Sequence, residues 1–186
     1  MADPNDIVFA GAAFAARAHR HQLRKDRETP YVSHTFRVCL VVRHVFGFDD
    51  PRMLAAALLH DTIEDTATDR DDISEAFGAD VARWVAALTK DMRMPEERRE
   101  AAYEAVLAAS EWQVKACKFA DIYDNLTDSD QLSLAGRKKA VARSERYLAA
   151  LRPNLPEALH VAFHLTEAKL ADVRARIISA SSEGKK

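Results

Sequence analysis

The sequence is poor in several features that define large classes of protein. It has only two cysteines and five glycines in 186 residues, and no apolar run approaches the ~20 residues that span a bilayer. Cys39 and Cys117 occupy apolar helical positions, so we interpret them as reduced core thiols rather than a disulfide framework or a zinc site. The N-terminus lacks the basic segment that begins a signal peptide. We therefore expect a cytoplasmic protein that does not enter the membrane.

The chain also lacks an excess of positive charge. Its formal net charge is −2, whereas proteins held by nucleic-acid phosphates carry a concentrated basic surface. Hydrophobic residues make up 48% and charged residues 30%, a balance typical of soluble globular proteins. We expect one folded domain and no nucleic-acid partner, and the sequence leaves the oligomeric state open.

Apolar residues recur at three- and four-residue spacing, and no segment shows the alternation of a strand. This periodicity predicts an all-α fold, with one domain over residues 1–179 and a polar tail over 180–186. Helix signals include Asp50 as a cap before Pro51, and a capping box formed by Ser110 and Gln113. The predicted helices include segments near 7–21, 95–109, 134–151 and 156–179.

The segment LLHDTIEDT, residues 58–66, places four candidate ligands or acids after an apolar run. On one continuous helix, His60 and Glu64 would be i,i+4 neighbours, as would Asp61 and Asp65. Imidazole and carboxylate together suit a borderline or hard divalent cation such as Mn²⁺. Two ligands do not complete a metal site, so further ligands must come from other helices.

The additional ligands are not fixed by spacing alone. Asp121 and Asn125 stand at i,i+4 spacing beside the apolar stripe of their predicted helix. They are either a metal ligand with its orienting neighbour or an ordinary solvent-side pair. Among the seven histidines, composition does not distinguish His34 from His19 or His44.

Four segments in the same order resemble a known family. HRHQLRKDRETPYVSH, AALLHDTIEDT, FGADVARWVAALTK and KFADIYDNL resemble the hydrolase domain of RelA/SpoT-type proteins, over about residues 5–150. That domain belongs to the HD-domain metal-dependent phosphohydrolases. The resemblance is strongest to the small stand-alone alarmone hydrolases of the metazoan SpoT-like type.

The resemblance implies a single helical HD-domain enzyme of the stringent response that uses Mn²⁺. Its implied substrate is a guanine nucleotide, guanosine 3′,5′-bis(diphosphate) (ppGpp) or pppGpp. Hydrolysis of the 3′-pyrophosphate gives GDP or GTP and pyrophosphate. Carried over by position, the resemblance implies these site residues: metal ligands His34, His60, Asp61 and Asp121; catalytic acids Glu64 and Asp65; substrate-binding residues Arg24, Lys25, Asn125, Arg143 and Tyr147.

Several positions depart from the family pattern, which keeps other readings open. Thr35 stands where proline is usual and Glu96 where metazoan relatives have lysine; the segment around Asp121 is altered at Ile122, Asp124 and Thr127. The loss of positive charge favours, as an alternative, HD-type hydrolysis of another nucleotide such as NADPH. A second alternative is a non-hydrolytic metal- or nucleotide-binding module, against which the intact acidic pair argues.

Overall fold

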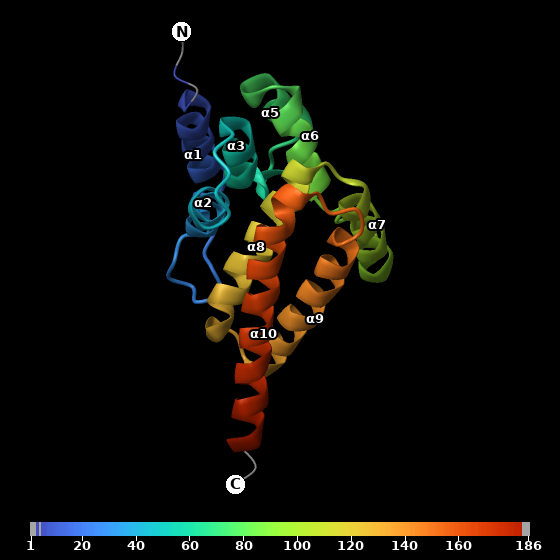
Figure 1. Cartoon of the computed structure of the whole chain (residues 1–186). Helices are drawn as coiled ribbons and strands as arrows, with labels where there is room; N and C mark the ends of the chain where they lie inside the picture. Colours follow the sequence, from blue (N-terminus) through green and yellow to red (C-terminus); the bar gives the residue numbers. More distant parts are fainter. Residues whose placement is uncertain (1–2, 4, 184–186) are drawn as a thin grey trace.

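The computed structural model describes residue 3 and residues 5–183. In this part of the chain the only extended pairing is an isolated antiparallel bridge between Leu23 and Pro30, so the predicted all-α fold is confirmed. The helices in chain order (Figure 1) are α1 (Asp6–Ala18), α2 (Val32–Leu40), the π-helix η1 (Val41–Val45), α3 (Pro51–Leu59), α4 (Thr62–Asp65), α5 (Arg70–Phe77), α6 (Ala79–Leu88), α7 (Glu96–Ala109), α8 (Trp112–Thr127), the 3₁₀-helix η2 (Asp128–Gln131), α9 (Leu134–Leu151), the 3₁₀-helix η3 (Glu157–Leu159) and α10 (His160–Glu183).

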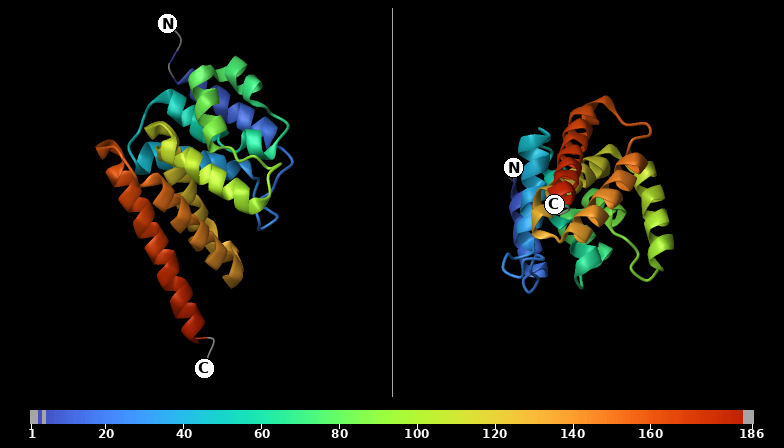
Figure 2. Two further views of the ribbon diagram at one scale, coloured as in Figure 1. Left: turned by 90° about the vertical axis from the view of Figure 1, so that its right-hand side faces the viewer. Right: turned by 90° about the horizontal axis from the view of Figure 1, so that it is seen from below.

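Helix α8 is the central element of the fold. It packs against α2, α3 and α6 and also against α9 and α10, while the C-terminal end of α10 extends beyond the other helices (Figures 1 and 2). Because neighbours cover α8 on nearly every side, its polar side chains are buried with its apolar ones. Lys118, Asp121 and Asp124 are each at most 7% exposed. Buried charges of this kind need partners, so α8 brings polar chemistry into the core.

Most predicted helices are present, but one predicted cap and one predicted helix end differ. The Asp50 side chain accepts the backbone N–H of Arg52 at 2.9 Å, which confirms the cap before Pro51. The capping box at Ser110 is wrong: α8 begins at Trp112 without a side-chain cap, and Ser110 instead donates to the Val106 carbonyl at the end of α7. The first helix ends at Ala18 rather than near residue 21.

The prediction of one continuous helix through LLHDTIEDT is also wrong. Helix α3 ends at Leu59, and α4 begins at Thr62. The Thr62 hydroxyl donates to the Leu59 carbonyl at 2.6 Å, and His60 Nδ1 lies 2.8 Å from the Ala57 carbonyl. Since side chains occupy these carbonyls, the α3 hydrogen-bond ladder stops there. The break directs His60 inward, where it is 3% exposed.

Three further expectations concern the cysteines, membrane-spanning helices and the C-terminal tail. Cys39 and Cys117 are both free and buried, as predicted. Among the described helices, none is both long and apolar enough to cross a membrane. Helix α10 continues to Glu183, into the predicted tail, and residues 184–186 lie outside the described part of the chain.

Candidate metal centre and active site

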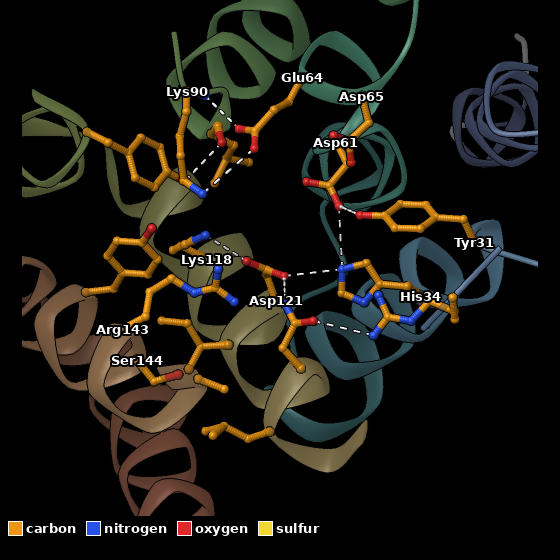
Figure 3. A pocket seen from close by; sticks show the side chains of 18 of the residues that line it. Tyr31, His34, Asp61, Glu64, Asp65, Lys90, Lys118, Asp121, Arg143 and Ser144 are labelled. Carbon is orange, nitrogen blue, oxygen red and sulfur yellow. Dashed lines mark hydrogen bonds and ion pairs between the residues drawn. The ribbon is translucent and has the colours of Figure 1, made fainter. Parts of the chain in front are cut away.

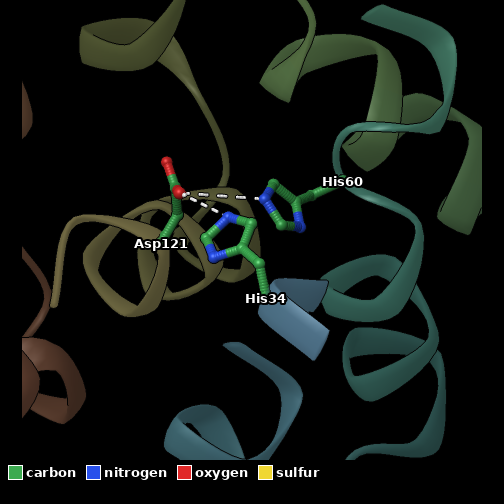
Figure 4. Close-up of side chains that lie close together, drawn as sticks. All are labelled: His34, His60 and Asp121. Atoms are coloured by element: carbon green, nitrogen blue, oxygen red, sulfur yellow. Dashed lines mark ion pairs between the residues drawn. The ribbon is translucent and has the colours of Figure 1, made fainter. Parts of the chain in front are cut away.

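Three of the predicted ligands meet in the core from three separate elements. His34 comes from α2, His60 from the break between α3 and α4, and Asp121 from α8 (Figure 4). One donor atom from each lies within 4.8 Å of the others. Asp121 Oδ1 is 3.2 Å from His34 Nε2 and 3.7 Å from His60 Nε2. Residues far apart in the sequence thus converge on one point.

The fourth predicted ligand, Asp61, borders this group. Its Oδ2 lies 3.0 Å from His60 Nε2 and 3.6 Å from His34 Nε2. The Tyr31 hydroxyl donates to the same oxygen at 2.6 Å and fixes the carboxylate. The pKa of Tyr31 is strongly raised, by burial first and then by the charge of Asp61, so this hydroxyl stays a neutral donor.

The His60 imidazole is oriented by the backbone. With the proton on Nδ1, the ring donates to the Ala57 carbonyl at 2.8 Å, and the lone pair of Nε2 faces the carboxylates. Nε2 is buried and makes no hydrogen bond of acceptable geometry, although Asp61 Oδ2 is 3.0 Å away. A buried nitrogen lone pair among carboxylate oxygens fits a metal ion.

The His34 imidazole is oriented by a second carboxylate. Its Nδ1 lies 2.7 Å from Asp124 Oδ2. With the proton on Nδ1, the ring donates to this carboxylate and the lone pair of Nε2 faces the centre. Arg37 in turn donates to both Asp124 oxygens, at 2.7 and 3.0 Å. This carboxylate–histidine arrangement raises the basicity of an imidazole ligand and fixes its tautomer. Asp124 therefore supports the centre rather than disturbing it.

The charges around this point favour a cation, and a proton on His60 and a divalent metal ion compete for that place. Burial disfavours the charged form of His60, yet the negative charges of Asp61 and Asp121 outweigh it and raise its pKa well above the usual value. Burial likewise disfavours the Asp121 carboxylate, but Lys118 and the two histidines lower its pKa well below the usual range. The buried Asp121 and the partly buried Asp61, whose pKa is also lowered, thus stay ionised and draw positive charge to the point where the donor atoms meet. Two imidazoles with two carboxylates suit a divalent transition metal.

The acidic pair lies beside this point on α4. Glu64 Oε2 accepts the backbone N–H of Lys90 at 2.8 Å, and both Glu64 and Asp65 line the pocket (Figure 3). Burial raises the pKa of Glu64, and burial together with the charge of Asp61 raises the pKa of Asp65. Carboxyl groups with raised pKa values exchange protons more readily near neutral pH.

A pocket of about 210 Å³ joins the candidate centre to the predicted substrate residues (Figure 3). It continues into an outer cavity of about 620 Å³, and both spaces are lined by Lys25, Glu64, Lys90 and Arg143. The pocket brings together all five predicted substrate-binding residues: Arg24, Lys25, Asn125, Arg143 and Tyr147.

These five residues have different surroundings. Asn125 Nδ2 donates to Asp121 Oδ1 at 2.6 Å, so it orients a predicted ligand. Arg24 is held by Asp128 at 3.1 Å, and the Tyr147 hydroxyl donates to Glu100 at 2.5 Å. Lys25 and Arg143 are exposed. Burial and the charges of Arg143 and Arg24 lower the pKa of Lys25.

Four residues that hold this geometry were not among the site residues predicted from the sequence. Lys118 and Asp124 lie three residues before and after Asp121, so i±3 spacing was a usable signal for both. Tyr31 and Lys90 gave no such signal, because each reaches the site only through tertiary contacts. Their contacts are to the two acidic side chains described above, on Asp61 and Glu64.

Two of the unusual positions are accommodated without disturbing the donors. Thr35 is fully buried, and its hydroxyl donates to the Val32 carbonyl at 3.0 Å. Ile122 is 3% exposed and lines the pocket. Glu96, in contrast, lines the outer cavity and adds negative charge there.

Comparison with known proteins places this geometry in a family. A model of the HD domain matches residues 11–152. The human guanosine-3′,5′-bis(diphosphate) 3′-pyrophosphohydrolase MESH1 is 41% identical over 130 residues, which cover 69% of this chain and 73% of the relative. A guanosine-3′,5′-bis(diphosphate) 3′-pyrophosphohydrolase from Aquifex aeolicus is 34% identical over 145 residues, but these cover only 20% of that protein.

A solved structure is also similar over nearly the whole chain. It is described as a metazoan ortholog of SpoT that hydrolyzes ppGpp, with a TM-score of 0.80 and 29% identity over 95% of this chain and 98% of that one. The helical fold and the buried His-His-Asp group define a metal-binding class of helical hydrolases. The chain belongs to the HD-domain family, among its RelA/SpoT-type members. The family and the donor set together imply a divalent metal.

Proposed function

We propose that this protein is a Mn²⁺-dependent ppGpp 3′-pyrophosphohydrolase, which also accepts pppGpp. The observation that carries the proposal is the convergence of His34, His60 and Asp121 beside Glu64, at the inner end of a pocket with several cations. The relatives named above supply the substrate class. Buried free thiols are consistent with a cytoplasmic location.

In this proposal, His34, His60, Asp61 and Asp121 hold the metal. A divalent ion held there supplies a Lewis acid and lowers the pKa of a water toward neutrality. Tyr31 and Asn125 fix the carboxylates at 2.6 Å each, so the donors need little rearrangement on binding. The side chains are thus organised before the ligand arrives.

Glu64 and Asp65 handle the protons of the reaction. The water oxygen bonds to the phosphorus attached to the ribose 3′-oxygen, the bond from that phosphorus to the 3′-oxygen breaks, and the 3′-oxygen takes a proton. Glu64 accepts a proton from the water, and its raised pKa lets it return one near neutral pH. Lys90 holds Glu64 through its backbone N–H, so the carboxylate stays directed into the pocket.

The cations at the pocket mouth bind the rest of the nucleotide. Lys25 and Arg143 line both the pocket and the outer cavity, where they face the 5′-phosphates of a nucleotide bound at the metal. Arg24 and Tyr147 line the same pocket, and in this proposal they contact the nucleoside. Arginine stacks on a purine as well as pairing with an anion.

The direct test is pyrophosphate release from ppGpp by purified protein with Mn²⁺, with Mg²⁺, and after chelation. We expect turnover with Mn²⁺ and none after chelation. Glu64→Gln serves as the inactive control, because it keeps the shape of the side chain. Absence of pyrophosphate release by a folded, Mn²⁺-loaded protein would overturn the proposal.

One observation favours a second candidate substrate. Glu96 adds negative charge to the outer cavity beside Glu100, and this weakens the attraction of the basic side chains there for the most highly charged nucleotides. A nucleotide with fewer phosphates, such as NADPH losing its 2′-phosphate, meets less repulsion. Comparing kcat/KM for ppGpp, pppGpp and NADPH decides between the substrates, and a clear preference for ppGpp removes the second candidate.

A further inference from the structure

Two lysines from separate segments share one pair of aromatic rings in the pocket wall. Lys118 Nζ lies 5.1 Å from the centre of the Tyr103 ring and 4.7 Å from that of Tyr147. Lys90 Nζ lies 5.4 and 5.8 Å from the same two ring centres. Both lysines line the pocket that contains the candidate metal centre. The two ammonium groups over the same pair of rings concentrate positive charge in this part of the pocket, which favours an anion there.

Their existing partners compensate the two charges unequally. Lys118 Nζ donates to Asp121 Oδ2 at 2.7 Å. Lys90 Nζ is 3.8 Å from the nearest oxygens of Glu64 and Glu100, too far for a hydrogen bond. Within the described part of the chain no acceptor is hydrogen-bonded to the Lys90 ammonium, although its side chain is only 15% exposed. Lys90 therefore has donors available to a ligand.

The two carboxylates nearest to Lys90 are engaged elsewhere. Glu100 Oε2 accepts from the Tyr147 hydroxyl at 2.5 Å and from Arg146 at 3.1 Å. Glu64 Oε2 accepts the backbone N–H of Lys90. These contacts hold both acids in place, so neither closes onto the ammonium group.

The lysine pair also lies next to the candidate metal centre. Asp121 connects Lys118 to the candidate metal centre, because its Oδ2 accepts from Lys118 while its Oδ1 is 3.2 Å from His34 Nε2. Lys90 and Lys118 approach the pocket from the side opposite His34 (Figure 3). An anion with two linked phosphates can place one phosphate at the metal donors and the other at the lysines.

We propose that Lys90 and Lys118 form a binding site for the distal phosphate of the scissile pyrophosphate group. The inference rests on the proposed function. During hydrolysis the site holds the phosphate that is not attacked, and after the bond to the ribose 3′-oxygen breaks it retains the pyrophosphate product. The lysines thereby position the reacting phosphorus at the metal and slow product release.

The test is pyrophosphate binding, measured by isothermal titration calorimetry on Mn²⁺-loaded protein freed of excess metal. Lys90→Gln is the decisive variant, since it removes the charge but keeps the backbone N–H that holds Glu64. Lys169→Gln is the matched control: Lys169 Nζ lies 4.9 Å from the centre of the Tyr123 ring, and Lys169 is not among the residues that line the pocket. We expect Lys90→Gln to weaken pyrophosphate binding about ten- to hundredfold and Lys169→Gln to leave it unchanged.

Lys118→Gln extends the test, with metal content and thermal unfolding measured alongside because this lysine also holds Asp121. Where that variant loses metal or fails to fold, Lys90→Gln alone decides. Equal pyrophosphate affinity for Lys90→Gln and Lys169→Gln, with ppGpp turnover intact in the unmodified protein, would overturn the lysine site and leave the proposed function standing. Lys90-dependent pyrophosphate binding without ppGpp turnover would support the site and overturn the proposed substrate instead.

Discussion

The two walls of the pocket differ in burial: one consists of buried side chains held in fixed positions, and the other of exposed, long side chains. On one wall, His34 and His60 are 1% and 3% exposed, and fixed groups hold their ring nitrogens in place. On the other wall, Lys25 and Arg143 are exposed and reach into the pocket on long side chains. Metal ligation requires donor atoms placed to within a few tenths of an ångström, whereas attraction between charges acts over several ångströms. The first wall therefore belongs to the core and the second to the surface.

The largest loss of metal and activity is expected when a donor is removed from the buried wall. Asp121→Ala leaves Lys118 without its partner and the two histidines without the carboxylate between them. We expect metal content to fall to zero and pyrophosphate release to fall to background. Elemental analysis and the ppGpp assay check this together.

The exposed acid Asp49 provides the control, as Asp49→Ala should retain both metal and activity. Thermal unfolding shows whether the Asp121 variant is folded, and His60→Ala is a second variant in case it is not. Stoichiometric Mn²⁺ in a folded Asp121→Ala protein would contradict the ligand assignment.

Replacing Glu64 while keeping the metal separates proton transfer from metal binding. Glu64→Gln should keep full metal content and lower kcat by about 10²–10⁴, because only proton transfer is lost. Steady-state kinetics on Mn²⁺-loaded protein measures the effect, with Glu75→Gln on α5 as an exposed control. A near-normal rate would show that another group transfers the proton.

The same carboxyl group sets a pH dependence whose sign follows from its surroundings. Burial raises the pKa of Glu64 above that of a free glutamate, roughly 4.3. As a base it must be ionised, so kcat/KM should fall as pH drops through this raised value, by about tenfold per pH unit. Rate profiles from pH 4 to 8 should lose that acidic limb in Glu64→Gln, and an identical limb in the variant would assign it to another group.

A smaller change affects the support behind a ligand rather than the ligand. Asp124→Asn keeps the size of the side chain but removes the charge facing His34 Nδ1, and we expect Mn²⁺ affinity to fall about 10–100-fold. Asp128→Asn is the matched control, since Asp128 accepts from the same Arg37 but makes no hydrogen bond to His34. Equal Mn²⁺ dissociation constants for the two variants, measured by calorimetry, would show that the Asp124 contact does not tune the metal site.

The smallest effect is expected on the exposed wall. Arg143→Gln should raise KM for ppGpp about tenfold with kcat little changed, because one binding charge is lost while the metal donors and Glu64 stay in place. The difference should shrink as salt increases, since exposed charges are screened. Arg174→Gln, which removes a surface arginine paired with Glu145, is the control. An unchanged KM would exclude Arg143 from nucleotide binding.

The sequence predicted the helices better than it predicted their junctions. The helix over residues 134–151 appears at those bounds as α9, because its apolar periodicity has no local competitor. The break at His60 was missed, because it depends on side chains that take the carbonyls at the end of α3. Helical periodicity reports which face is apolar, but it does not report where a hydroxyl or imidazole replaces a backbone donor.

By itself, the sequence determined an all-helical chain with ligand-type residues in HD and KFAD segments, and these motifs carried the family resemblance. Tertiary structure brings His34, which helical spacing did not single out and only the family resemblance implied, to Asp121, because that contact depends on how α2 packs against α8. It also decided the roles of Asp124, Lys90 and Lys118, because the groups that their charges contact are brought to them only by packing. A charged residue has the same propensity on a solvated or a buried face, and only packing supplies the partner that makes its burial stable.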